Sequence, residues 1–496
     1  MAARVALATA WPALAEDQAG RAVAMPQWMI DQIRMLPPFD PWLTGSVAAD
    51  VAMATYASAD ALAARQARRL AELLSAAARR SPAYRRLLAG RPASQVRLGE
   101  LPITRKPELM RHFADWVTDP QIRLDALRRF TADAARVGEP FIGRYVVWES
   151  SGSSGEPAFF VQDALAMAVY DALEVLRRPD FKPAQSFLDP LGLTERNVFV
   201  GAIGGHFASA VSIERLRRLN PALAGRLRSV SFLQPMPRLV SELQALAPTL
   251  DATYPSAAVL LAEERLAGRL NIAPREIWTG GETLSAAMRR FVEEAFGCRV
   301  VNSYGASEFL SLACECRRGS LHLNSDWALL ESVDADGAAV APGAFGATTL
   351  LTNLANHVQP LIRYDLGDRI AMQATPCPCG SRLPVIEVEG RCDDTLRLEA
   401  PGRASVHVLP LALCTVLEDE AGLFDFQLVQ EGPNELLLTS ASRGEPAARK
   451  LKRASTRLAA FLAAQGASGV RLRCRSGQPG HQGRTGKVKR VIASPH

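Results

Sequence analysis

Apolar residues recur at helical spacing in the first hundred residues and at a different spacing after about residue 140. Residues 61–74 place alanine and leucine on one face and arginine on the other, which predicts an amphipathic helix. Between about 140 and 370, short β-branched or aromatic runs such as 145–148 and 197–200 alternate with helix-like segments such as 165–177. This alternation predicts an α/β core whose strands are joined by crossover helices.

The pattern changes again after Gly390. A charged turn leads into leucine- and valine-rich strands, an Arg/Lys-rich helix over 447–464 and a further strand after it. We therefore predict an α/β protein with a large multi-sheet N-terminal domain and a small α+β C-terminal domain. The expected parts are a helical extension packed on the core (1–95), a large domain (96–390) and a mobile C-terminal domain (391–496).

Composition narrows the class of protein. The chain has 496 residues, of which 48% are hydrophobic and 22% charged, as in a folded globular protein. A net charge of +6 suits small polyanionic ligands but is too dilute over this length for a nucleic-acid-binding protein. The longest apolar stretch, 406–417, falls short of the ~18 residues of a membrane helix, and Trp11-Pro12 interrupts any secretion signal. We expect no nucleic-acid or membrane partner and a cytoplasmic location.

A loop rich in serine and glycine follows the predicted strand 145–148. Its residues are Ser150, Ser151, Gly152, Ser153, Ser154 and Gly155, followed by Glu156 and Pro157. Glycines permit positive φ, and successive N–H groups and hydroxyls can surround a phosphate. Taken alone, such a loop is more often a flexible connection. It is a candidate phosphate site that needs support from other motifs.

Five further motifs follow the loop along the chain. They are Gly280-Gly281-Glu282, Asn302-Ser303-Tyr304-Gly305-Ala306-Ser307-Glu308, Arg363-Tyr364-Asp365-Leu366-Gly367-Asp368, Gly390-Arg391-Cys392-Asp393-Asp394 and Arg484-Thr485-Gly486-Lys487-Val488-Lys489-Arg490. In order and spacing, the set resembles the motifs of the adenylate-forming superfamily, which includes acyl-CoA ligases, luciferases and peptide-synthetase adenylation domains. The resemblance implies an enzyme that uses ATP to activate a carboxylic acid as its acyl-adenylate.

The resemblance also implies a role for each motif residue. Glu308 would hold Mg²⁺ against the phosphates, Asp368 would accept the ribose hydroxyls, and Lys487 would bridge the carboxylate and ATP in the transition state. Arg391 would assist at the ribose or phosphate, and Asp393 would be the hinge of the C-terminal domain. The other implied nucleotide-binding residues are Ser150, Ser151, Gly152, Ser153, Ser154, Gly155, Gly281, Glu282, Ser303, Tyr304, Gly305 and Ser307. The implied acyl pocket contains His206, Tyr304 and Gly305, although a plain loop histidine is an equal alternative for His206.

Within the superfamily the chain most resembles the phenylacetate–CoA ligase branch. The residues that carry this resemblance are Ile203-Gly204-Gly205-His206-Phe207, Tyr254-Pro255-Ser256 and Gly319-Ser320-Leu321-His322. Two Cys-x-Cys pairs about 60 residues apart also offer soft ligands for a tetrahedral zinc ion, and some members of this branch carry a structural metal. The predicted ligands are Cys316, His322, Cys377 and Cys379, with Cys314 as the alternative in the first pair. Free cysteines in turns are the other interpretation.

We therefore predict an AMP-forming aryl or arylacetic acid–CoA ligase in which the large domain binds ATP and the acid, and CoA is the co-substrate. Two departures from the family pattern qualify this prediction. Glu156 replaces a lysine that many relatives have, and residues 395–407 do not match the loop that contacts the pantetheine arm of CoA. An amide synthetase with an amine acceptor, or a carrier-protein loader, remains an alternative. A non-catalytic nucleotide-binding relative is a third, and a homodimer stays open.

Overall fold

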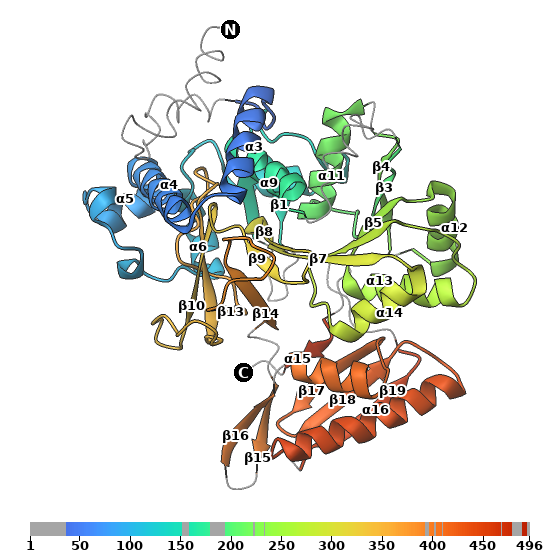
Figure 1. Cartoon of the computed structure of the whole chain (residues 1–496). Coiled ribbons are helices and arrows are strands. Elements are labelled where there is room, and N and C mark those ends of the chain that lie inside the picture. Colours follow the sequence, from blue (N-terminus) through green and yellow to red (C-terminus); the bar gives the residue numbers. More distant parts are fainter. Residues whose placement is uncertain are drawn as a thin grey trace.

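A nine-stranded sheet runs through the body of the molecule (Figure 1). The computed structural model describes residues 36–150, 158–178, 194–221, 224–232, 234–391, 396–400, 403–408, 410–467, 469–478 and 489–493. In order across the sheet, the strands are β13 (Asp368–Met372), β14 (Val385–Arg391), β9 (Leu321–Leu323), β8 (Phe309–Glu315), β7 (Arg299–Ala306), β6 (Glu276–Thr279), β5 (Leu250–Thr253), β3 (Asn197–Gly201) and β4 (Leu227–Ser231). The prediction of an α/β core is confirmed.

The sheet has a parallel half and an antiparallel half, and they meet at β7. Strands β3 to β7 run parallel, and their connections contain α11 (Ala208–Leu219), α12 (Met236–Leu246), α13 (Pro255–Leu266) and α14 (Ala286–Phe296). Val200, Leu243 and Ile277 belong to the hydrophobic core between these helices and strands. The antiparallel half adjoins two smaller sheets, β1 (Val146–Glu149) with β2 (Phe159–Gln162), and β10 (Ala328–Val333) with β11 (Thr348–Asn353) and β12 (Tyr364–Asp365).

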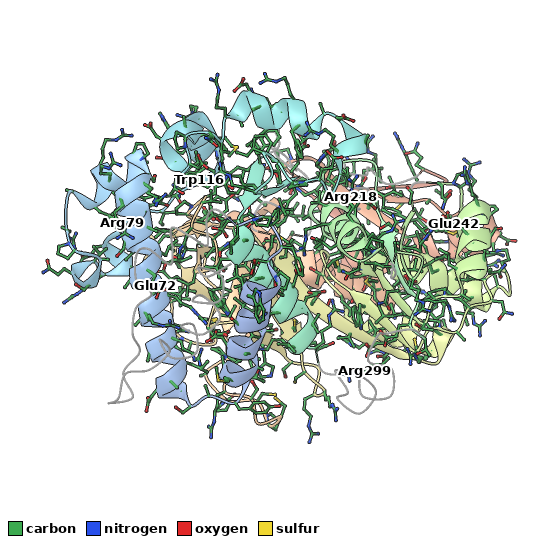
Figure 2. The ribbon with its side chains drawn as sticks, turned by 90° about the horizontal axis from the view of Figure 1, so that it is seen from above. Glu72, Arg79, Trp116, Arg218, Glu242 and Arg299 are labelled. Carbon is green, nitrogen blue, oxygen red and sulfur yellow. The ribbon has the colours of Figure 1, made fainter. Side chains whose placement is uncertain are left out.

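The N-terminal helices share the core of the body. They are α3 (Pro41–Thr55), α4 (Ala59–Arg80) and α5 (Pro82–Leu88), followed by the short helices α6 (Lys106–Arg111), α7 (Phe113–Trp116) and α8 (Leu124–Thr131). The predicted helix 61–74 lies within α4, and Ser58 caps its first turn. Val47 and Leu73 are fully buried in the same cluster as Trp148 and Leu173 of the body, the last of which lies on α9 (Ala164–Leu176). In Figure 2, Arg79 on α4 and Glu242 on α12 mark opposite ends of the molecule.

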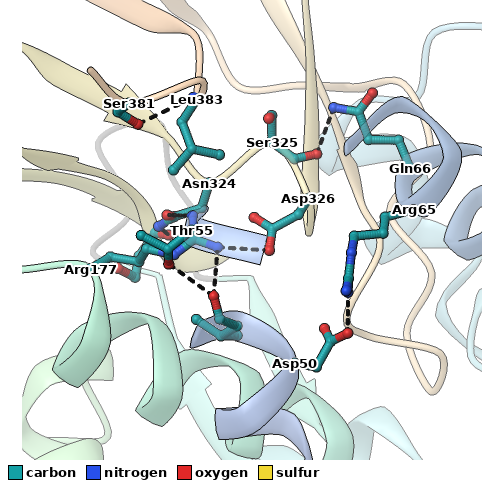
Figure 3. Close-up of polar contacts among 12 residues, drawn as sticks. Asp50, Thr55, Arg65, Gln66, Arg177, Asn324, Ser325, Asp326, Ser381 and Leu383 are labelled. Carbon is teal, nitrogen blue, oxygen red and sulfur yellow. Dashed lines mark hydrogen bonds and ion pairs between the residues drawn. The ribbon is translucent and has the colours of Figure 1, made fainter. Parts of the chain in front are cut away.

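A buried network of ion pairs joins α3 and α4 to the body. Asp50 of α3 pairs with Arg69 of α4, and Arg69 reaches Asp326, which also pairs with Arg177 at 2.9 Å. Asp326 is completely buried and Arg69 is 2% exposed. Figure 3 shows the contacts of Asp50 with Arg65 and of Arg177 with Asp326. Charges removed from water in this way are stable only while each keeps its partner, so these helices are firmly attached.

A smaller C-terminal module, the described residues from Leu396 onward, has its own core. Its elements are β15 (Leu396–Ala400), β16 (Arg403–Val408), α15 (Pro410–Thr415), the π-helix η6 (Val416–Glu420), β17 (Phe426–Gly432), β18 (Glu435–Ser440), α16 (Glu445–Ala464), β19 (Arg471–Ser476) and β20 (Val491–Ile492). Leu458 of α16 packs on Leu428 and Leu438 of a four-stranded sheet. The helix predicted over 447–464 therefore lies within α16. The predicted domain boundaries near 95 and 390 stay predictions. Among the described helices, none is long and apolar enough to cross a membrane.

Candidate functional site

The motif residues gather where the parallel strands of the body end. Gly280, Gly281 and Glu282 directly follow β6, while Ser303 and Tyr304 lie in the last half of β7. In open α/β sheets, ligands bind outside the carboxyl ends of the strands, because loops there leave a crevice lined by exposed backbone and side chains. The predicted nucleotide-binding residues that the structure describes thus occupy the edge where a ligand is expected.

Two glycines allow unusually close approach of neighbouring chain segments at this edge. A Cβ atom at Gly305 would lie 1.9 Å from the carbonyl oxygen of Leu310, so only glycine fits in this strand. At Gly280 a Cβ would lie 2.9 Å from Oγ of Ser303, whose hydroxyl donates to the Thr279 carbonyl at 3.2 Å. The motif of Gly280 and the motif of Ser303 are therefore in direct contact, at a distance that a larger side chain at position 280 would not allow.

The side chains of Tyr304 on β7 and Asp368 on β13 are joined by a hydrogen bond. The Tyr304 hydroxyl donates to Oδ2 of Asp368, which opens β13. In the antiparallel pairing of β13 with β14, Asp368 lies opposite the backbone of Arg391. Residues predicted from three separate motifs thus come together, and the hydroxyl of Tyr304 holds the Asp368 carboxylate in one orientation. The side chain of Arg391 lies outside the described residues.

Glu308 lies in the tight turn between β7 and β8, and other side chains hold this turn in place. The Tyr364 hydroxyl donates to Oε1 of Glu308 at 2.9 Å, and the Asn353 amide donates to its backbone carbonyl at 2.9 Å. The indole N–H of Trp148 donates to the Ser307 carbonyl at 2.8 Å. The Glu308 side chain is half-buried, so its carboxylate is both oriented and accessible. Such a group can act as one of the few protein ligands that Mg²⁺ needs.

Ser150 closes the neck of the serine-glycine loop, and a lysine that the sequence analysis missed reaches it. Ser150 and Ala158 exchange hydrogen bonds, N–H of Ser150 to the Ala158 carbonyl at 2.8 Å and N–H of Ala158 to Oγ of Ser150 at 3.0 Å. Nζ of Lys106 lies 3.3 Å from the same Oγ atom. A lysine at the start of a short helix carries no local mark of this role. The only hint was Glu156 at a position where a lysine was expected.

The backbone before Lys106 is tied to a predicted motif. The N–H of Thr104 donates to the Arg363 carbonyl at 3.0 Å, and the N–H of Asp365 donates to the Thr104 carbonyl at 2.9 Å. Lys106 therefore reaches Ser150 from a segment that is paired with β12, whose Tyr364 contacts Glu308. The Lys106 ammonium group and the Glu308 carboxylate are therefore linked through β12, which pairs with the segment before Lys106 and contacts Glu308 through Tyr364.

Two predicted residues have other partners in the structure. Oε2 of Glu282 accepts a hydrogen bond from the N–H of Ser256 at 3.1 Å, in the first turn of α13. His206 is 2% exposed, and its ring packs 5.3 Å from that of Phe130. Burial lowers the pKa of His206, while backbone hydrogen bonds with Arg136 and Thr131 act in the opposite direction. Their nucleotide and acyl-pocket roles stay predictions.

Several predicted residues lie outside the described part of the chain. They are Ser151, Gly152, Ser153, Ser154 and Gly155 of the loop, the hinge Asp393, and Lys487. The described chain resumes at Lys489 and Arg490, the last two residues of the lysine motif.

A second cluster lies at the antiparallel end of the sheet. The ligand atoms of Cys316, His322, Cys377 and Cys379 all lie within 4.8 Å of one another. Sγ of Cys316 is 3.9 Å from Sγ of Cys377, and Sγ of Cys379 is 3.3 Å from Nε2 of His322. Cys314 instead lies near Oγ of Ser311, 3.6 Å away. The structure brings the four predicted ligands together and leaves out the alternative.

The geometry of this cluster suits a cation. Nδ1 of His322 lies 2.9 Å from the Leu383 carbonyl, so a proton on Nδ1 leaves Nε2 as the ligand atom that faces the three sulfurs. Burial acts to raise the pKa of the Cys377 thiol, but hydrogen bonds with the Cys379 backbone and Ser320 outweigh it and lower the pKa to about 6. Three sulfurs and one imidazole nitrogen form a ligand set that zinc prefers.

Comparisons with known proteins agree with this geometry. No family model matches the chain. Phenylacetate-coenzyme A ligase of Thermus thermophilus is 28% identical over 375 residues, which cover 72% of this chain and 75% of that protein. Protein CapK of Staphylococcus aureus is 26% identical over 175 residues, 34% of this chain and 36% of that protein.

The fold is that of a solved acid–CoA ligase. The crystal structure of 2-hydroxyisobutyryl-CoA ligase with 2-HIB-AMP, in the postadenylation state, matches with a TM-score of 0.62 at 22% identity, over 89% of this chain and 91% of that chain. The fold is thus that of the adenylate-forming superfamily, and in sequence the chain is similar to an AMP-forming acid–CoA ligase. The same ligase in its thioesterification state matches less well, with a TM-score of 0.51 at 22% identity over 88% of this chain and 91% of that chain. The arrangement of body and C-terminal module therefore resembles the postadenylation state more closely.

Proposed function

We propose that this chain activates a carboxylic acid with ATP as its acyl-adenylate and then transfers the acyl group to coenzyme A. The observation that carries the proposal is the joint placement of Glu308, Asp368 and Lys106 on one connected edge of the body. Adenylation brings an anionic carboxylate to an anionic triphosphate, so the site must neutralise charge and hold the reacting groups in line. A metal-binding carboxylate, a ribose-binding carboxylate and a cation near the phosphate loop meet these needs.

Each residue has a distinct task in this proposal. The Asp368 carboxylate, oriented by Tyr304, would accept both ribose hydroxyls and so place the α-phosphate. Glu308, oriented by Tyr364, would hold Mg²⁺, which supplies charge neutralisation at the phosphates when bound. Lys487 would carry the mobile charge that bridges the acid and ATP in the transition state.

Lys106 supplies the charge that the serine-glycine loop lacks. The loop ends in Glu156 where many relatives have a lysine, so its own side chains carry no positive charge. The Lys106 ammonium group, 3.3 Å from Ser150, offers a cation at the entrance of the loop. We therefore assign it to the β- and γ-phosphates of ATP, together with the backbone N–H groups of the loop.

An aryl or arylacetic acid is the substrate class that we favour. Phe199 lies in the middle of β3, and Phe232 and Tyr254 directly follow the neighbouring parallel strands β4 and β5. The ring centroids of Phe199 and Phe232 lie 6.2 Å and 5.8 Å from that of Tyr254. Aromatic side chains prefer such edge-to-face packing and would accept one more ring in the same way. The relationship to a phenylacetate-coenzyme A ligase supports the same class.

The direct test is pyrophosphate release with a panel of aromatic, arylacetic and short hydroxy acids. We expect release that requires Mg²⁺ and one class of acid and that is lost in Lys487→Ala. Coenzyme A, hydroxylamine and amines are then compared as acceptors for the enzyme-bound adenylate. An acid-independent signal, or none with any acid, would contradict the enzymatic proposal. Faster transfer to amines than to CoA would favour an amide synthetase.

We further propose that the cluster of Cys316, His322, Cys377 and Cys379 holds a structural zinc ion. The ion would join the turn after β8 to the loop before β14, two segments about 60 residues apart. Metal analysis of the purified protein should give one zinc per chain, and a chelator should raise hydrogen exchange in 376–386. A folded, metal-free protein with unchanged exchange would contradict the assignment. The cysteines that the structure describes are free thiols, which supports the proposed cytoplasmic location.

A further inference from the structure

Among the contacts that the described residues make between the C-terminal module and the body is a buried polar contact at the start of α14. The Ser285 hydroxyl, which caps α14 by accepting the N–H of Met288 at 3.1 Å, donates to Oε2 of Glu418 on η6. Glu418 is 2% exposed, and its other oxygen, Oε1, accepts from Nη1 of Arg490. Because Ser285 belongs to the body and Glu418 to the module, this contact exists only while the two parts are in the observed arrangement.

An aromatic pair lies beside this polar contact. The rings of Phe291 on α14 and Phe424 of the module stack at 5.2 Å with an angle of 22° between their planes. Arg490 also reaches Sδ of Met288 at 3.5 Å. The body side of the contact is therefore one face of α14, and the module side is η6 with the residues that follow it.

A like-charge pair opposes these attractive contacts. The pKa of Glu263 on α13 is raised, first by burial and then by the nearby negative charge of Asp425 in the module. Two carboxylates that approach each other weaken the contact, while the positive charge of Lys450 on α16 acts on Glu263 in the opposite direction. The module is thus held by a small number of interactions that partly offset one another, as an element with two accessible positions requires.

Arg490 connects this contact to the lysine motif. Its guanidinium also donates to the Phe424 carbonyl at 2.7 Å, and its own carbonyl accepts from the N–H of Leu428. Lys487 lies three residues earlier in the chain. A contact that fixes Glu418 therefore also fixes Arg490, the last residue of the motif that contains Lys487.

We propose that Ser285, Glu418 and Phe291 form a latch that holds the module in the arrangement for adenylate formation, and that the latch must open before the acyl group is transferred. The proposal rests on the function proposed above. It is supported by the greater likeness of this arrangement to the postadenylation state (TM-score 0.62) than to the thioesterification state (TM-score 0.51) of the related fold. We propose Glu418 as a positioning residue, because it holds Arg490, which lies three residues after Lys487 in the sequence.

Ser285 offers a matched pair of variants. Ser285→Gly removes the hydroxyl that Glu418 accepts, yet glycine replaces serine as a helix cap at little cost. Ser285→Thr keeps both the cap and the donor. Phe291→Ala weakens the latch independently, without touching the cap.

Two half-reactions are measured for each variant: acid-dependent pyrophosphate exchange, and thioester formation from supplied acyl-adenylate and CoA. In Ser285→Gly and in Phe291→Ala, we expect the ratio of the first rate to the second to fall at least about fivefold, because loss of the contact shifts the population away from the adenylation arrangement. Ser285→Thr should keep the ratio of the wild type. An unchanged ratio in both Ser285→Gly and Phe291→Ala would overturn the proposal.

Hydrogen exchange separates failure of the latch from failure of the proposed function. Uptake in 285–296 and 416–426 should rise in Ser285→Gly and stay at the wild-type level in Ser285→Thr, whether or not any acid is activated. If the wild type releases no pyrophosphate with any acid, the proposed function fails while this contrast still tests the contact. Equal uptake in the two variants would overturn the latch even in an active enzyme.

Discussion

The N-terminal helices and the C-terminal module are attached to the same body by contacts of different kinds. Asp50, Arg69, Asp326 and Arg177 form a continuous buried network between the helices and the body. The module is held at α14 by the Ser285–Glu418 contact and one stacked aromatic pair.

The difference lies in what would be exposed on separation. Burial acts to raise the pKa of Asp50, but the charges of Arg69 and Arg65 outweigh it and hold the pKa below its usual value. Opening this network would leave arginines and carboxylates buried without partners, which makes partial separation costly. At the module, the described contacts with α14 are the Ser285–Glu418 hydrogen bond, the stacked aromatic pair and the approach of Arg490 to Met288. We expect the first attachment to be permanent and, as proposed above, the second to release.

The largest expected effect is on the permanent attachment. Asp326→Ala leaves Arg69 and Arg177 buried without their shared carboxylate, so we expect the free energy of unfolding to fall by about 3–5 kcal/mol in urea denaturation. Glu100→Ala, which removes only the exposed ion pairs with Arg91 and Arg97, is the control and should leave stability unchanged. Equal losses in the two variants would mean that the buried network does not carry the attachment.

The second largest effect on stability is expected in the parallel half of the sheet, at Asp251. Asp251 on β5 is buried with Oδ1 unpartnered among the described residues, and burial raises its pKa to about 7. An acid whose pKa is raised in the folded state favours folding below its unfolded pKa near 4 and loses that contribution as the pH rises through 7. Asp251→Asn should therefore raise the free energy of unfolding by roughly 2 kcal/mol at pH 8 and hardly at all at pH 4. A gain that is the same at both pH values would contradict the assignment.

The third prediction asks whether the N-terminal region contributes to chemistry as well as to stability. Lys106→Ala should slow acid-dependent pyrophosphate release about tenfold or more, because the phosphates lose a nearby cation, while urea denaturation stays unchanged. Lys106→Arg keeps the charge and should retain part of the rate. A rate for Lys106→Ala equal to that of the wild type would show that the serine-glycine loop needs no external cation.

The smallest effect is expected at the releasable attachment. Ser285→Gly should change the free energy of unfolding of the body by less than about 1 kcal/mol, since glycine caps a helix nearly as well as serine. The measurement is urea denaturation followed by tryptophan fluorescence, beside the half-reaction ratio. A loss as large as that in Asp326→Ala would contradict the contrast between the two attachments.

Local patterns predicted the elements, and ordered motifs predicted the edge on which the candidate site lies. The periodicity of 61–74 lies within α4, and the helix-like segment at 165–177 matches α9. Tyr304 and Asp368, named from separate motifs, are in contact. The two Cys-x-Cys pairs and His322 pointed to the cluster of four possible metal ligands, with Cys314 as an alternative that the structure leaves out. The helices follow from a periodicity within a few residues, and the site residues were named from short motifs along the chain.

Contacts between distant charges were not predictable in this way. Arg69 and Asp326 are 257 residues apart, and no motif links the arginine on α4 to this aspartate. Lys106 and Ser150 are 44 residues apart and belong to no common motif. Which arginine is buried, and which lysine faces a loop, depends on how the helices pack. The roles of the site residues stay predictions.

The position of strand β14 determines how a force on the C-terminal module would reach the body. Its Val385 end pairs with β9 beside His322, whereas its Arg391 end leads the chain into the C-terminal module. Any load applied to the module therefore enters the body along this strand, and its antiparallel ladders with β13 and β9 carry that load in shear, since their hydrogen bonds run across the pulling direction. The cluster of Cys316, His322, Cys377 and Cys379 lies near the Val385 end of β14 and, with a bound ion, would hold that end in place under load.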